Sequence, residues 1–257
     1  MLKKVIFFFV VAILMASPLR AHDFWAGLEK AAVGEPALIF LGFGHHFPAA
    51  DEIKAEVYAE RFEPITLIGT KGPIALKAGA QGQDFVSEAP LAAGSYYVLA
   101  AGKPGFSSRS PSGYVRKSKA DEPSAISCSY GASYGKNLIN LDPPSPDSFV
   151  TKPVGQKLEI VPQVNPAKVK VGEKFPVKVL FDGKPLAGAS LGAYFEGFSE
   201  GNEALAFSAT TNKDGLVNII PLRPGAWLAK VSKSDPYSDP KICDRESYSA
   251  SLAFTIP

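Results

Sequence analysis

All three histidines of this 257-residue chain lie within 25 positions of each other, at His22, His45 and His46. Neutral imidazole is the commonest protein ligand for zinc, copper and nickel. If residue 22 begins the mature chain, His22 offers a metal both its ring Nδ1 and a free α-amine. The pattern therefore predicts a metal site with up to four nitrogen donors, which suits Ni(II) or Cu(II) in tetragonal geometry and also admits Zn(II).

Three carboxylates accompany these histidines in the sequence, namely Asp23, Asp51 and Glu52. Such groups act as weak metal ligands or accept a hydrogen bond from the far N–H of a ligating imidazole. Sulfur contributes little, because both methionines fall within the first 15 residues and the other two sulfur atoms belong to the two cysteines. A methionine-rich Cu(I) site is therefore not expected.

The local chain around His45 and His46 determines whether both can serve one metal. In a regular strand, neighbouring side chains point to opposite faces of the sheet. Gly44 and Pro48 flank the pair and favour a turn, in which both rings could converge. The alternative is a polar turn without metal and a frayed terminus at His22. The aromatic residues around the motif are expected to form core or a hydrophobic wall.

The N-terminus has the order of a secretory signal peptide. Lys3 and Lys4 precede an apolar run of eleven residues, which is too short to span a bilayer, and Ala21 supplies the small residue for cleavage. We expect residues 1–21 to be removed, with an uncleaved anchor as the alternative because Leu19 occupies a position that favours a small residue. Removal changes the formal charge from +2 to −1, and no basic block remains to suggest nucleic-acid binding.

Export also bears on the two cysteines, Cys128 and Cys243. Exported proteins meet an oxidising compartment, in which two cysteines usually pair. We therefore expect a disulfide that joins the end of the first half of the chain to the end of the second, with two buried thiols as the alternative.

The elements that must position these residues are predicted to be strands. Apolar residues occur in short runs bounded by Gly, Pro, Asp and Asn, which indicates an all-β fold. Candidate strands in the first half are 37–43, 53–58, 65–68 and 96–101. Residues 107–119 are rich in basic side chains and are expected to form a solvated loop, with docking to a membrane partner as the alternative. A Pro-rich stretch at 142–147 and the turn at Gly155 divide the chain into an N-terminal β-rich metal-binding domain, 22–154, and a C-terminal domain, 155–257.

The C-terminal domain is predicted to be a seven-stranded β-sandwich. The expected strands are 158–164, 169–171, 175–181, 190–195, 216–220, 227–231 and 249–256. Asp182-Gly183 and Asp214-Gly215 are predicted to form hairpin turns. The stretch 183–189, followed by 210–215 and Pro224-Gly225, resembles sandwiches of the transthyretin-like or carboxypeptidase-regulatory type. Such modules serve as spacers or binding platforms and do not indicate chemistry by themselves.

Nearly the whole mature chain resembles the exported proteins known as periplasmic components of nickel and cobalt uptake transporters. The resemblance rests on the start 22–25, the motif 44–48, and the stretches 158–162 and 183–189. It implies a periplasmic nickel- or cobalt-binding accessory protein, free or tethered to the membrane. Such a protein presents metal to inner-membrane components of an energy-coupling or ABC-type transporter. Many relatives carry Glu where this chain has Asp23, which departs from the family pattern. No small organic substrate is expected.

Two other classes of function stay open. A terminal histidine together with a second histidine is similar to the histidine brace of copper monooxygenases and to sites of periplasmic copper carriers. A crowded metal with three imidazoles and an amine favours carriage over catalysis, and the chain lacks a His-Glu-x-x-His zinc motif, so we do not expect an enzyme. The remaining class is a structural surface module of two sandwiches that binds no metal.

Overall fold

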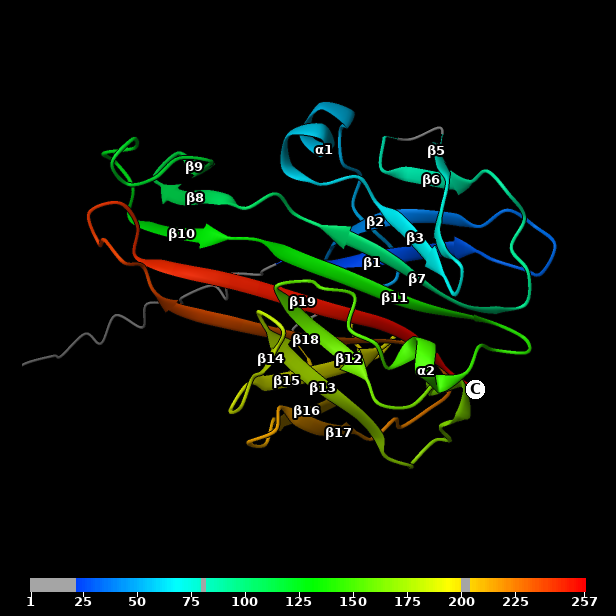
Figure 1. Cartoon of the computed structure of the whole chain (residues 1–257). Coiled ribbons are helices and arrows are strands. Elements are labelled where there is room, and N and C mark those ends of the chain that lie inside the picture. The colour runs from blue at the N-terminus through cyan, green and yellow to red at the C-terminus, as the bar shows by residue number, and fades with distance from the viewer. Residues whose placement is uncertain (1–21, 80–81, 200–203) are drawn as a thin grey trace, which may run out of the picture.

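The chain is built almost entirely from β-strands. The computed structural model describes residues 22–79, 82–199 and 204–257, and the predicted signal peptide lies outside this part. Within it, two short α-helices and one turn of 3-10 helix accompany the strands (Figure 1). The prediction of an all-β fold is confirmed.

The N-terminal residues form a four-stranded antiparallel sheet with the strand order β1–β2–β6–β5. Its strands are β1 (Asp23–Lys30), β2 (Leu38–Gly44), β5 (Leu76–Ala78) and β6 (Asp84–Ser87). The short helix α1 (Ala55–Arg61) follows the loop after β2, and its Tyr58 packs against Phe62 and Phe85. This packing places α1 against the hydrophobic core of the first half of the chain.

A large sheet, eleven strands in the part of the chain that the structure describes, runs through both halves, and eight of these strands follow one another in the order β16–β15–β18–β19–β11–β7–β3–β4. These strands are β3 (Thr66–Gly69), β4 (Gly72–Ile74), β7 (Gly94–Ala101), β11 (Ser133–Leu141), β15 (Ser190–Phe195), β16 (Phe207–Thr210), β18 (Gly225–Pro236) and β19 (Arg245–Ile256). β18 and β19 pair along their whole length. β11 lies between β7 and β19, antiparallel to the first and parallel to the second.

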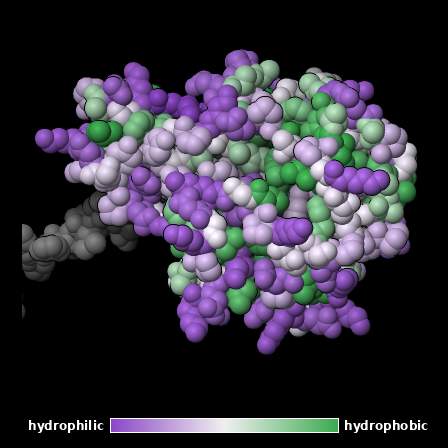
Figure 2. All heavy atoms as spheres, in the orientation of Figure 1, coloured by the Kyte–Doolittle hydropathy of each residue, from purple (hydrophilic) through white to green (hydrophobic). Residues whose placement is uncertain are grey.

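The other three of the eleven strands form a side arm of the large sheet, seen at the upper left of Figure 1. They are β8 (Gly105–Ser110), β9 (Gly113–Val115) and β10 (Ser127–Gly131), and β10 pairs with both β8 and the start of β19. The segment 107–119 is therefore largely a hairpin and not the loop that its composition suggests. Hydrophilic residues dominate this arm and the lower edge of the face in Figure 2.

A third sheet covers the C-terminal part of the large one and completes a sandwich. It contains β12 (Leu158–Pro162), β13 (Phe175–Phe181), β14 (Lys184–Pro185) and β17 (Leu216–Ile219). Phe175 of β13 packs against Phe254 of β19 with ring centroids 4.8 Å apart, and Trp227 of β18 is fully buried beside them. The predicted C-terminal sandwich is present, with its core between two sheets.

Two hydrophobic cores correspond to the two halves of the chain. The first is formed by residues between Phe24 and Leu141, and the second by residues between Leu158 and Ile256. The short helix α2 (Asp147–Val150) and the 3-10 turn η1 (Pro166–Lys168) lie close to the change from one core to the other. The proposed boundary at residues 154–155 coincides with this change, although the eleven-stranded sheet is shared. The division into two domains itself stays a prediction.

Several predicted elements differ from those observed. The sequence predicts a strand at 53–58, but the helix α1 begins at Ala55, because Ala, Glu and Arg within residues 55–61 favour a helix. Residues 169–171 form no strand, since η1 precedes them and Gly172 follows with a positive φ. The described residues of the C-terminal part contain eight strands, β12 to β19, because the short β14 and β16 escape the hydrophobic pattern.

The two predicted hairpin turns behave differently. Asp182 and Gly183 both have positive φ and join β13 to β14, which confirms the first hairpin. Gly215 also has a positive φ, but the strands on either side of it belong to different sheets, β16 pairing with β15 and β17 with β13. The second turn therefore crosses between the layers of the sandwich, and its prediction as a hairpin is wrong.

Cys128 and Cys243 form a disulfide, which confirms the predicted pairing. It joins β10 to the loop between β18 and β19. Asp244, next to Cys243, accepts hydrogen bonds from the Cys128 backbone N–H and from Lys119 Nζ, both at 2.7 Å. The Lys119 and Cys128 hydrogen bonds hold the pKa of Asp244 below its usual value. The side arm is thus fixed to the loop that precedes β19 by one covalent bond and two polar contacts.

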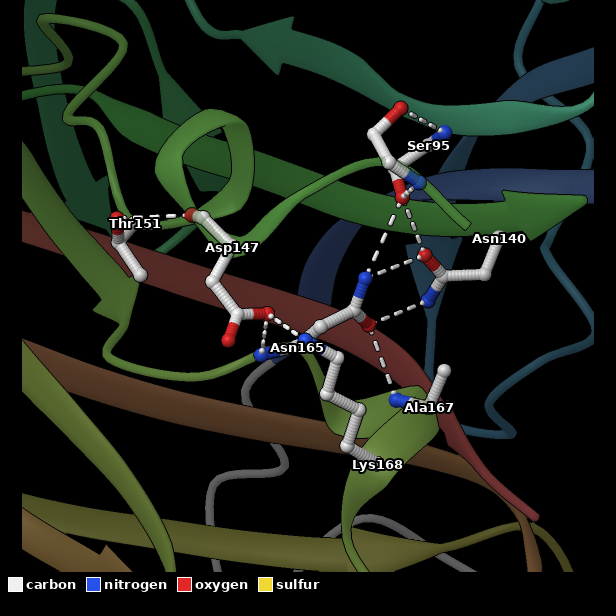
Figure 3. Close-up of polar contacts among 8 residues, drawn as sticks. Ser95, Asn140, Asp147, Thr151, Asn165, Ala167 and Lys168 are labelled. Carbon is white, nitrogen blue, oxygen red and sulfur yellow. Dashed lines mark hydrogen bonds and ion pairs between the residues drawn. The ribbon is translucent and has the colours of Figure 1, made fainter. Parts of the chain in front are cut away.

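A buried polar network ties β7, β11, α2 and η1 together (Figure 3). Asn165 is fully buried, and its side chain exchanges hydrogen bonds with Asn140 at 2.9 and 3.0 Å. The Ser95 hydroxyl donates to the same Asn140 oxygen at 2.6 Å. Asp147 accepts from the Asn165 backbone N–H at 3.2 Å. Because these groups satisfy one another away from water, the network fixes how the first half of the chain meets the second.

A buried ion pair connects β11 to β12 at the same junction. Lys136 and Glu159 are 0% and 1% exposed, and their Nζ and Oε1 atoms lie 2.6 Å apart. Glu159 also accepts hydrogen bonds from the backbone N–H groups of Val154 and Gly155. Burial lowers the pKa of Lys136, and the charge of Glu159 opposes that shift.

We predict that Lys136→Met destabilises the protein by about 3–5 kcal/mol, because it leaves the Glu159 carboxylate buried without a counter-charge. The matched control is Lys168→Met, which breaks a pair with Asp147 whose side chains are 56% and 39% exposed. That change should cost about 0–1 kcal/mol. Urea unfolding measures both, and equal losses would contradict the importance of the buried pair.

Candidate metal centre

The pairing of the first two strands brings two of the three histidines together. β1 and β2 are antiparallel with Asp23 opposite Gly44, so the residue before β1 lies beside the residue after β2. The His22 and His45 rings accordingly contact each other, with centroids 4.1 Å apart. His22 also stacks on Phe43, at 4.5 Å and with nearly parallel planes. The register of one hairpin thus explains how residues 23 positions apart share a site.

The chain turns immediately after β2, as Gly44 and Pro48 predict. Residues 45–48 are irregular, and His46 and Ala49 form an isolated antiparallel bridge. A Cβ on Gly44 would lie 3.0 Å from the Asp51 carboxylate, at a φ of +150° that disfavours other residues. His46 is exposed, and no ring contact joins it to His22 or His45 in the part of the chain that the structure describes.

The Nδ1 atom of His45 is the notable polar atom of this site. It is buried, and it has no hydrogen-bond partner within the described residues. Buried polar atoms of native proteins nearly always have a partner, so an orphaned one calls for an explanation. An unshared nitrogen lone pair on a neutral imidazole is the group that binds a transition metal.

The three carboxylates lie in different surroundings. Asp51 Oδ2 is 3.5 Å from His22 Nε2, which places it where it can orient that imidazole. Asp23 instead accepts from Lys230 Nζ at 3.0 Å and from the Tyr194 hydroxyl at 2.8 Å. Glu52 is exposed, and no ion pair or hydrogen bond links it to a histidine among the described residues.

The electrostatics of the site favour the neutral form of the His22 imidazole. Partial burial lowers the pKa of His22 below its usual value, and the adjacent His45 adds to this effect. The charges of Asp51 and Asp23 act in the opposite direction. On the other side of Asp23, burial raises the pKa of Tyr194, and the Asp23 carboxylate raises it further. Tyr194 is therefore a protonated donor that holds the start of β1.

The side chains alone do not make up a complete metal cage. Within residues 22–79, 82–199 and 204–257, no group of three or more His, Cys, Asp or Glu side chains is placed to hold a metal ion. Two imidazoles in contact supply two donors, and the α-amine of a chain that starts at His22 would add a third. With that amine, the donor set of two rings and one amine would match that of a histidine brace.

Three residues that position the site could not be predicted from the sequence, namely Gln83, Tyr194 and Lys230. Gln83 is buried, donates to the carbonyls of Leu41 and Asp51, and accepts from the Ile53 N–H, so it fixes the loop behind the histidines. Tyr194 and Lys230 reach Asp23 from the C-terminal half. An isolated polar residue carries no motif, and contacts across 171 or 207 positions have no local signal.

Two Gly-x-Ser-x-Gly pentapeptides, 131–135 and 188–192, occur outside this site. A nucleophile elbow requires a sharp turn from a strand to a helix. Ser133 and Ser190 instead lie in strands β11 and β15, and the Ser133 hydroxyl is bonded to Ser249. These pentapeptides therefore do not have the geometry of a hydrolase nucleophile.

We predict that Gly44→Ala displaces Asp51 and disturbs the His22 stack on Phe43. Gly34→Ala is the control, since Gly34 also has a positive φ, +82°, but has nothing within 4 Å of an added Cβ. Both variants should lose about 1–3 kcal/mol from backbone strain. Only Gly44→Ala should shift the ring-proton NMR signals of His22. Unchanged His22 signals in Gly44→Ala would contradict this geometry.

None of the helices among the described residues has the length and apolar character needed to cross a membrane. An "Uncharacterized protein" of Haemophilus influenzae (strain ATCC 51907 / DSM 11121 / KW20 / Rd) is 28% identical over 216 residues, which cover 83% of this chain and 82% of that protein.

Similar solved structures include the D0-D1 domain of Intimin, at 15% identity and a TM-score of 0.22, covering 90% of this chain and 97% of that one. The D00-D0 domain of Intimin, at 13% identity and a TM-score of 0.21, covers 91% and 100%. Scores this low carry no argument about function. The family model for the domain of unknown function DUF4198 matches residues 19–235, and the chain belongs to that family.

Proposed function

We propose that the protein binds one divalent transition-metal ion through His22 and His45 and carries it to components of a metal uptake transporter in the inner membrane. The supporting observation is the contact between the two imidazole rings, 4.1 Å between centroids, with the His45 Nδ1 atom buried and unpartnered in the described chain. An empty donor beside a second imidazole is what a metal site requires.

The α-amine of His22 is the proposed third donor. Nδ1 and the amine of an N-terminal histidine close a six-membered chelate ring, which holds the metal at residue 22, and His45 then adds its imidazole. Asp51, 3.5 Å from His22 Nε2, is proposed to orient the ring through its far nitrogen. This role requires the chain to begin at His22, as the predicted cleavage after Ala21 would provide.

His46 is proposed as an additional ligand that joins on metal binding. It lies in the same turn as His45 and is exposed, so a rotation of its side chain costs little packing. With His46 the site would have four nitrogen donors, which favours a carrier of Ni(II) or Co(II), in keeping with the resemblance to nickel and cobalt uptake proteins. We infer a periplasmic location from the predicted leader.

A copper protein is the second candidate function. The two rings in contact and the amine make three nitrogen donors, the number in a histidine brace, and this set leaves coordination positions open for O₂ chemistry or for transfer to a partner. His46 distinguishes the candidates, because a brace does not need it.

We predict that the exported, mature protein binds one equivalent of Ni(II) or Co(II), measured by isothermal titration alongside intact mass. Loss of an imidazole ligand should cost more than the roughly 10–100-fold caused by loss of an outer hydrogen-bond partner. His22→Ala and His45→Ala should therefore weaken binding by more than about 100-fold, and Asp51→Asn by about 10–100-fold. One extra residue before His22 should weaken binding as much as His22→Ala.

His46→Ala decides between the two candidates. A large loss of Ni(II) affinity supports the four-nitrogen carrier. Unchanged affinity, tight Cu(II) binding and reductant-dependent formation of peroxide support the copper brace. A protein that starts at His22 and binds none of Ni(II), Co(II), Cu(II) and Zn(II) is a structural module, and the proposal would then be wrong.

A further inference from the structure

We propose that a groove between α1 and the side arm binds a small organic polycarboxylate. The groove has a volume of about 330 Å³, at the lower end of the range for ligand pockets. Its lining comes from the end of α1, from the connection between β7 and β8, and from residues of β1, β2, β8, β10, β11 and β19; Figure 1 shows where α1 and the side arm lie. The sequence predicts no small organic ligand, and the segments that form this groove are far apart along the chain.

Three cationic side chains, Arg61, Lys103 and Arg116, line this groove. Lys103 Nζ donates to the uncharged Ala59 carbonyl at 2.7 Å. Arg116 Nε lies 3.8 Å from Glu60, and the Arg61 guanidinium has no acidic partner among the described residues. The lining contains no Asp or Glu. The groove therefore carries a local excess of positive charge in a protein whose formal charge is close to zero.

The position of Arg116 depends on a glycine. A Cβ on Gly105 would lie 2.5 Å from a terminal nitrogen of the Arg116 guanidinium, so any larger residue at 105 would displace it. Arg116 crosses the first residue of β8 because that residue has no side chain. Guanidinium groups bind carboxylates with two parallel hydrogen bonds, which makes arginine the preferred residue for planar anions.

The remaining walls suit an organic molecule better than an inorganic ion. Four phenylalanines line the groove, and Phe24 stacks on Phe62 with centroids 5.6 Å apart. The hydroxyls of Ser107 and Ser129, also in the lining, make no side-chain hydrogen bond within the described residues. Apolar walls with a few free donors and two arginines match a carbon skeleton that bears several carboxylates.

The groove adjoins the candidate metal centre through Phe43. One side of this ring stacks on His22 at 4.5 Å, and Phe43 also lines the groove, 6.4 Å from the Phe62 ring. Polycarboxylates chelate divalent metals through oxygen ligands. Resting on the proposed metal-binding function, this contiguity indicates that metal and chelating anion bind side by side. The anion site itself stands on the groove alone.

Citrate titrated into the metal-free, full mature protein by calorimetry tests the anion site. We expect saturable binding that falls about 10–100-fold in Arg61→Gln and in Arg116→Gln, because each removes charge-assisted hydrogen bonds. Arg109→Gln is the matched control, since Arg109 is an exposed arginine of β8 outside the groove, and it should bind citrate like the parent protein.

Further titrations identify the class of ligand and distinguish the proposed anion site from the proposed metal centre. Inorganic phosphate should bind at least about tenfold more weakly than citrate; equal affinity, or equal loss in Arg109→Gln, overturns the organic polycarboxylate. His45→Ala should retain citrate binding in the absence of metal. Retained citrate binding in a protein that binds no metal supports the groove and refutes the metal centre. Metal binding without citrate binding supports the metal centre and refutes the anion site in the groove.

Discussion

The parallel pairing of β11 with β19 is the contact on which the rest of the molecule depends. It places the last strand of the first half beside the last strand of the chain, with Ser133 opposite Ser249. Each partner then continues into its own half, β11 to β7 and β19 to β18. The buried pair of Lys136 and Glu159 sits on this seam, where an alternative register would bury a charge without a partner.

The position of the candidate metal centre depends on this pairing of β11 with β19. β1 lies across the large sheet, where the Asn137 side chain donates to the Ala26 carbonyl and the Ser251 hydroxyl donates to the Phe24 carbonyl. Asp23 is held from β15 and β18 by Tyr194 and Lys230. Asp23, the residue next to His22, is thereby anchored by strands from the far end of the chain. The proposed role of His22 as a terminal ligand would benefit from such anchoring, because a free terminus loses conformational entropy on binding a metal.

Local features were predictable from the sequence, and long-range ones were not. The turn at His45 and His46 follows from Gly44 and Pro48, and the disulfide agrees with the pairing expected of two cysteines behind a predicted signal peptide. Most strands of the sandwich follow from alternating apolar runs bounded by turn residues. The crossing at Gly215 could not be predicted, because a positive φ serves a hairpin and an interlayer turn equally well. The groove depends on segments that only the fold brings together.

The pairing of β11 with β19 also determines the order in which parts of the chain can fold. The hydrogen bond from the Ser251 hydroxyl to the Phe24 carbonyl spans 227 positions. Likewise, β11 pairs with β19, which follows it in the chain by more than a hundred residues. Contacts of such high sequence separation make folding slow, since loop-closure entropy must be lost before they form. Until residues 245–256 arrive, β11 presents an unpaired edge that can join other chains. A chain of this topology gains from being kept unfolded until its C-terminus is available.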